Sequence, residues 1–148
     1  LLSTILVDIL QNTVLAGMQR ALTGRQSLRE ELTQLFRTAA SFAFAHQVPM
    51  AACAPLHLSQ FAGLPESTRL RIGECHQQVQ QILRRRLEKA RRDGEMRAVS
   101  VDAVAGLING ALDSMVLTRW GRDTVEQLQA AGDEVTEVFF GGIGRREV

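Results

Sequence analysis

The sequence predicts an all-α fold of about six helices, and three observations lead to it. Apolar residues recur at helical spacing through most of the 148 residues, and no segment alternates apolar and polar residues as a strand does. Capping residues and glycine or proline breaks separate the periodic stretches. The hydrophobic content of 45% and charged content of 22% are ordinary globular values. We therefore expect residues 1–148 to form one helical domain.

The first helix is expected from Leu1 to about Leu22, where Thr23 and Gly24 end it. It begins without a methionine or a capping residue, so we expect an N-terminal part to precede it. A secretory leader does not fit, because a basic region and a cleavage site are both missing. Apolar residues surround most of this helix, so it should touch more than one layer. The two sides are formed by Leu2, Leu6 and Ile9, and by Val7, Val14 and Met18.

The second helix is expected from Ser27 to His46. Ser27 and Glu30 have the spacing of a capping box, and Val48-Pro49 stops the helix. One face is consistently apolar and should pack into the core. That face is Leu28, Leu32, Leu35, Phe36, Ala39, Phe42, Ala43 and His46.

A long third helix is expected from about Pro65 to Arg92, after a short irregular helical segment at 56–61. Gly94 is available for the left-handed conformation that ends a helix. His76 falls within the apolar stripe, where a buried imidazole needs a hydrogen-bond partner or a ligand. The stripe is Ile72, His76, Val79, Leu83, Leu87 and Ala90.

The last two helices are expected from Ser100 to Trp120 and from Asp123 or Thr124 onward, with a frayed tail from Gly141. The stretch 100–120 is largely apolar and has only three charged residues, so it should be covered on nearly all sides. A small domain has little interior to offer, and a partner chain is the natural cover. The charged residues are Asp102, Asp113 and Arg119.

The sequence carries no sign of catalysis, a cofactor or a resident metal. It lacks a phosphate loop, a zinc-protease motif and a nucleophile elbow. Its net charge of +1 exerts no general attraction on nucleic acid or membrane, and no apolar run could span a bilayer. Cys53 and Cys75 are expected to be free thiols in a reducing cytoplasm. We interpret the basic run at 84–97 as a solvated helix end, because no aromatic residues interleave its arginines.

Over nearly its whole length, the chain resembles the regulatory domain of TetR-type bacterial repressors. The resemblance rests on Arg92-Asp93-Gly94-Glu95, then Asp102, then a small-residue-rich apolar helix. The opening Leu1-Leu2 is similar to the start of the helix that follows the family's DNA-binding module. The resemblance implies a ligand-binding domain that dimerises through a four-helix bundle of its last two helices. It also implies a helix-turn-helix head upstream, through which alone the protein would meet operator DNA.

Small residues on the last two helices support a homodimer independently, since they let a second helix approach closely. Gly106, Gly110 and Asp113 recur at spacings of four and three, and Gly132 is a similar point on the last helix. Packing within one chain is the alternative. The predicted interface is Ala103, Gly106, Gly110, Leu117, Val125, Leu128, Gly132, Val135 and Phe139.

An effector pocket is expected among the apolar stripes, with a few polar groups to orient the ligand. Lysine and arginine are absent from these stripes except for Arg69 and Arg86 at their margins. We therefore expect a small hydrophobic effector that is neutral or weakly cationic, although core packing is the alternative for each residue singly. The predicted lining is Phe42, His46, Phe61, His76, Val79, Leu83, Asn109, Asp113 and Met115.

Two functions from different classes remain open at this point. The first is the regulatory domain of a repressor, in which effector binding relieves DNA binding by the upstream head. The second is a stand-alone helical dimerisation or adaptor module without an effector. A preceding stretch of roughly 45 to 55 residues encoding a helix-turn-helix unit would distinguish the first from the second.

Overall fold

The computed structural model describes residues 2–45, 63–117 and 124–143, and these residues form helices and turns without a strand. The all-α prediction is confirmed. The expected short helix at 56–61 lies outside the described residues. The elements are α1 (Leu2–Asp8), η1 (Ile9–Leu15), α2 (Ala16–Ala21), α3 (Leu28–Ala45), α5 (Glu66–Arg92), α6 (Val101–Leu117) and α7 (Val125–Ile143).

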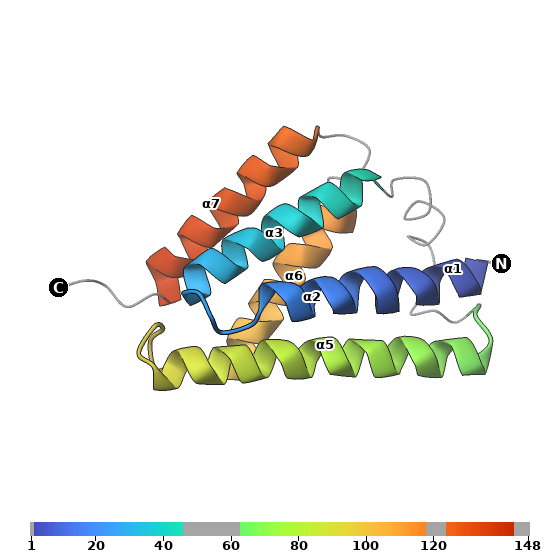
Figure 1. Ribbon diagram of the computed structural model, residues 1–148, viewed down its shortest axis with the longest axis horizontal. Helices are drawn as coiled ribbons and strands as arrows, with labels where there is room; N and C mark the ends of the chain where they lie inside the picture. The colour runs from blue at the N-terminus through green and yellow to red at the C-terminus, as the bar shows by residue number, and fades with distance from the viewer. Residues whose placement is uncertain (1, 46–62, 118–123, 144–148) are drawn as a thin grey trace.

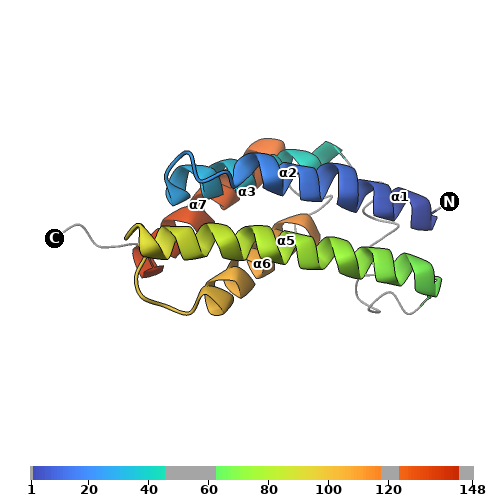
Figure 2. The ribbon, with the colours of Figure 1, turned by 60° about the horizontal axis from the view of Figure 1, so that its bottom comes forward.

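The helices are arranged around α3, which contacts α2, α5, α6 and α7. α1, η1 and α2 form one continuous rod that runs alongside α5 (Figures 1 and 2). α7 lies along α3, and α6 lies beneath α3 against α5. The expected fraying from Gly141 is wrong for the first residues of the tail, because α7 continues to Ile143.

The predicted helix starts are confirmed by their hydrogen bonds. The hydroxyl of Ser27 accepts from the Glu30 amide at 3.2 Å, and the Ser27 amide donates to the Glu30 carboxylate at 3.0 Å, which is a capping box. The Ser100 hydroxyl accepts from the Ala103 amide at 3.3 Å. Thr124 and Gln127 cap α7 reciprocally, at 3.3 and 2.7 Å. These side chains fix where α3, α6 and α7 begin.

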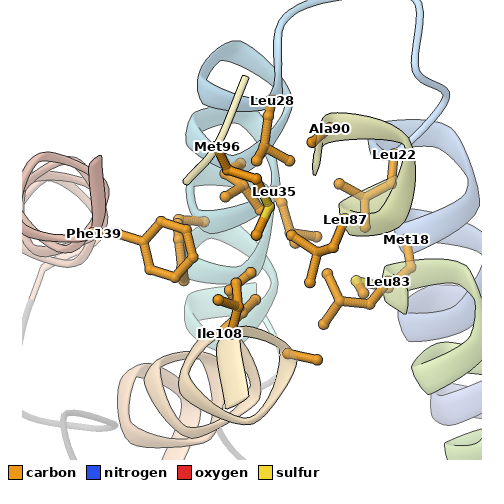
Figure 3. Packing of buried hydrophobic residues seen from close by; sticks show 14 of the residues in the cluster. Met18, Leu22, Leu28, Leu35, Leu83, Leu87, Ala90, Met96, Ile108 and Phe139 are labelled. Carbon is orange, nitrogen blue, oxygen red and sulfur yellow. The ribbon is translucent and has the colours of Figure 1, made fainter. Parts of the chain in front are cut away.

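The main core joins side chains from α2, α3, α5, α6 and α7 (Figure 3). Phe36, Leu32, Leu83 and Ile108 have no exposed surface, so the centre is fully dry. A second, smaller cluster lies between α1 and the start of α5. It consists of Leu6, Val7, Leu64 and Ile72, with half-buried Leu10 against it.

The predicted stripe of α5 is wrong at His76, which is exposed. Cys75 is buried in its place, with 4% of its surface exposed. Both residues lie within one turn of buried Ile72, and a rotation of about 100° per residue separates them. The helix turns the apolar thiol inward and leaves the imidazole in water, because a buried imidazole would need polar partners.

Candidate functional site

A buried ion pair is the most polar feature of the interior. Arg86 on α5 and Glu31 on α3 have side chains that are only 2% and 1% exposed. The Arg86 Nε donates to the Glu31 carboxylate. Two opposite charges removed from water in this way must satisfy each other and their remaining hydrogen-bonding capacity.

Glu31 meets that requirement through the turn that precedes α3. One of its oxygens accepts from the backbone amide of Gly24 at 2.7 Å and from the Thr23 hydroxyl at 3.1 Å. Gly24 has φ of 72°, and a side chain there would meet Lys89. The turn after α2 therefore depends on glycine and on the buried carboxylate.

Glu95 completes the cluster from the turn after α5. Gly94, with φ of 76°, ends the helix and directs the next residue back toward Arg86. The Glu95 carboxylate accepts from Arg86 Nη1 at 3.1 Å and from the Leu28 amide at 2.5 Å. It thus pairs with the guanidinium and also satisfies an amide at the start of α3. In this chain, the glutamate of the Arg-Asp-Gly-Glu turn is a structural ligand for Arg86.

All three nitrogen atoms of the Arg86 guanidinium donate hydrogen bonds to acceptors among the described residues. Its Nη2 donates to the Gln26 carbonyl at 3.1 Å and to Glu95 at 3.3 Å. The guanidinium is therefore engaged by protein acceptors and fixes the ends of α2, α3 and α5 to one another. We assign Arg86, Glu31 and Glu95 a positioning role and call them the Arg86 cluster.

Sequence reasoning misplaced these residues. The basic run at 84–97 was expected to be solvated, and Arg86 was expected at a pocket margin, but Arg86 is buried. A signal was present in the spacing. Arg86 follows Leu83 by three residues and precedes Ala90 by four, which places it on the buried stripe of α5.

The Arg86 cluster makes the free energy of unfolding depend on pH in the acidic range. Burial raises the pKa of Glu31, but the hydrogen bonds and the charge of Arg86, with bonds from Thr23 and Gln26, outweigh burial and lower the pKa below 4.5. The stabilisation from Glu31 is therefore present above about pH 4.5 and is lost as the pH falls through the folded-state pKa. The pKa values of Glu30, through hydrogen bonds from Ser27, and of Asp93, through a bond from Lys89, are lowered too.

We expect Glu31→Gln to flatten the dependence of the free energy of unfolding on pH below about pH 4.5, because this variant has no carboxyl at position 31. Urea unfolding at a series of pH values measures the slope. Glu30→Gln serves as the control for a lowered pKa on the surface. An acid slope for Glu31→Gln equal to that of the wild type would contradict the assignment.

The residues predicted to line the effector pocket differ widely in their burial. Leu83 is fully buried in the main core, and Val79 packs against it half-buried. Phe42 and Asn109 are half-buried, whereas Asp113 and His76 are exposed. The exposed His76 thus lies apart from the buried side chain of Leu83 in the main core. His46, Phe61 and the side chain of Met115 lie outside the described residues.

The hollows over the described residues are open to the surface. One, of about 550 Å³, is lined by the turn from Gly94 to Val99. The other, of about 340 Å³, lies over polar residues of α3. Neither is lined by a predicted pocket residue. Within this part of the chain, the apolar cavity expected for an effector does not appear among these hollows.

The predicted dimer residues divide into two groups. Leu128 and Phe139 are buried in the main core, Gly132 is buried, and Val135 packs against the core. This stripe of α7 packs within the same chain, where α7 lies along α3. Val125 is half-buried, and the side chain of Leu117 lies outside the described residues.

The other group lies on the outside of α6. Ala103, Gly106 and Gly110 are exposed, and Leu107 beside them is 62% exposed. A Cβ added at either glycine would meet nothing within 4 Å. We call Ala103, Gly106, Leu107 and Gly110 the outer face of α6. Glycine inside a helix is destabilising by roughly 0.5–1 kcal/mol relative to alanine. Packing among the described residues does not account for the two glycines.

The described residues contain no helix with the length and apolarity needed to cross a lipid bilayer. They also contain no group of three or more histidine, cysteine, aspartate or glutamate side chains placed to hold a metal ion. No family model, curated protein or solved structure matches the chain.

Proposed function

We propose that the chain is the ligand-binding and dimerisation domain of a TetR-type transcriptional repressor and acts as a homodimer. The observation that carries the dimer is the outer face of α6. It carries a 62% exposed leucine and two helix-interior glycines, and no described residue lies within 4 Å of a Cβ built at either glycine. Small residues of this kind are favourable where a second helix comes close.

The regulatory part of the proposal rests on the resemblance of the Arg92–Glu95 turn and the apolar helix after it. A small hydrophobic effector would bind within the helices, and binding would relieve operator binding by an upstream helix-turn-helix head. An effector shifts this equilibrium only if it prefers the conformation that does not bind DNA. The helix order and the exposed outer face of α6 are consistent with this arrangement.

The alternative is a helical adaptor that dimerises without an effector. Both functions use the outer face of α6, so the oligomeric state does not distinguish them. An operator-binding assay on the full-length protein does. Release of operator DNA by a small apolar compound supports the repressor, and the absence of any DNA binding supports the adaptor.

We expect Leu107→Glu to convert a dimer into a monomer, because it places a charge in the centre of the contact. Leu70→Glu is the matched control, since Leu70 on α5 is also 62% exposed. Sedimentation velocity at micromolar concentration measures both variants. Gly110→Arg should behave like Leu107→Glu, and the open space at Gly110 means that the fold of one chain tolerates the change.

Two outcomes would count against the dimer proposal. One is a wild-type chain that sediments as a monomer at micromolar concentration. The other is a dimer that Leu70→Glu dissociates and Leu107→Glu leaves intact, which would move the contact from α6 to α5. Circular dichroism of each variant confirms that the helices remain folded.

A further inference from the structure

The first rod of the structure changes its winding in the middle. α1 and α2 are α-helices, whereas η1 between them is a π-helix, in which each hydrogen bond spans one more residue. Its sequence, ILQNTVL, contains no proline or glycine to impose the change. π segments are rare, and they occur frequently at functional sites.

The π winding brings the buried side chains of α1 and those of α2 to the same side of the rod. In an unbroken α-helix, Met18 would lie about 120° around the axis from Leu6 and about 80° from Leu10. Yet Leu6 and Met18 are 6% and 3% exposed, and both belong to clusters that include residues of α5. Each π residue turns the chain by less than an α residue does, so η1 removes most of this offset.

The same sequence also fits a second register. If the rod were α-helical throughout, Val7, Leu10, Val14 and Met18 would form one stripe, at spacings of three, four and four. Leu6, which shares a cluster with Ile72 of α5, would then turn away from α5. In the structure, Leu6 and Ile9 are buried, while Leu10 and Val14 are only half-buried. The π register thus buries Leu6 and Ile9 together with Val7 and Met18, and it leaves Leu10 and Val14 half-buried.

The two halves of the rod pack into different hydrophobic clusters. α1 contributes to the small cluster and α2 to the main core. Gly17, just after η1, is buried, yet a Cβ there would meet nothing within 4 Å, so the junction is loosely packed. On the surface, Arg71 of α5 donates to the Gln11 side chain of η1 at 3.2 Å.

We propose that η1 is a rotation joint that converts between π and α winding. The conversion turns α1 about its axis against α5 while α2 stays in the main core. Burial of Leu6 and Ile9 favours the π state, and relief of the unfavourable winding favours the α state. This inference does not depend on the proposed function, since it uses only the rod and α5.

Deletion of Asn12, an exposed residue of η1, tests whether η1 holds one residue more than an α-helix would need to align α1 with α2. After the deletion, an ordinary α-helix places Leu6 within about 20° of Met18. We expect the variant to unfold cooperatively, at a urea concentration no lower than the wild type. Deletion of Gln34, an exposed residue in the middle of α3, is the control. It turns one half of α3 by about 100° and should abolish cooperative unfolding. Equal damage by the two deletions would overturn the proposal.

Leu6→Gln combined with Ile9→Gln tests whether the α register is accessible, because it removes the apolar groups that favour the π state. We expect the variant to fold with α winding through residues 9–15, and with the Leu10 and Val14 methyl groups in contact with α5 in NMR spectra. Ile5→Gln is the control, since Ile5 is already 38% exposed and should leave the π winding in place. A double variant that unfolds, or that keeps the π winding, overturns the proposal.

Discussion

Arg86→Met is expected to lower the free energy of unfolding by about 3–5 kcal/mol, because it leaves the carboxylate of Glu31 buried without its charge partner. Methionine fills a similar volume, so the loss reflects charge and hydrogen bonding more than a cavity. Urea unfolding at neutral pH measures it. The loss should shrink in acid, where Glu31 without the guanidinium binds a proton more readily and becomes neutral.

Arg37→Met provides the matched control on the surface. Arg37 makes two hydrogen bonds to Asp133, at 3.1 and 3.0 Å, with geometry as good as that of the buried pair. Its side chain is 51% exposed, so water screens the pair and we expect a much smaller loss than for Arg86→Met. If Arg86→Met and Arg37→Met lowered the free energy of unfolding by the same amount, burial would not explain the stabilisation by the Arg86 cluster.

The positions of the helices could be predicted from the sequence because local chemistry determines them. Ser27 with Glu30, Ser100 and Thr124 each cap the helix that was expected to follow them. Gly94 ends α5 in the expected left-handed conformation. Such signals lie within a few residues of the feature that they specify, so they can be recognised without knowledge of the fold.

The interior chemistry could not be predicted in the same way. Glu31 meets Arg86 from a helix that is 55 residues away in sequence, and only the packing of α3 on α5 brings the two side chains together. Glu95 is nine residues from Arg86 and reaches it because the turn at Gly94 directs the chain back along α5. His76 and Cys75 are neighbours on one helix, and the spacing alone did not decide which of them is buried. The π winding of η1 was also missed, because it depends on where α5 lies relative to both halves of the rod.

The predicted dimer interface on α6 and α7 also depends on packing that the sequence alone does not specify. An apolar stripe on α7 indicates that something covers it, but it does not say whether the cover is α3 or a second chain. The structure assigns Leu128 and Phe139 to α3 and leaves Gly106 and Gly110 exposed on α6. The predicted interface residues on α6 and α7 therefore differ in their exposure, which the sequence pattern alone did not indicate.

Phe36→Ala is expected to lower the free energy of unfolding by about 3–5 kcal/mol, the range for truncating a buried aromatic side chain. Phe36 on α3 has no exposed surface and belongs to the core that joins α2, α5, α6 and α7 to α3. Its removal leaves a cavity at the centre of that core, and tightly packed neighbours collapse into it only in part. Urea unfolding at a fixed protein concentration measures the loss, since a dimer's apparent stability depends on concentration.

Phe44→Ala is the control on the same helix. Phe44 lies two turns further along α3 and is 47% exposed, so its truncation should change the free energy of unfolding by about 0.5 kcal/mol or less. An effect as large as that of Phe36→Ala would show that Phe44 is covered in solution. The cover would then have to come from outside the described residues, because within them the ring is half open to water. A small effect of Phe44→Ala with a large effect of Phe36→Ala places the stabilising core of this chain where α3 meets the other helices.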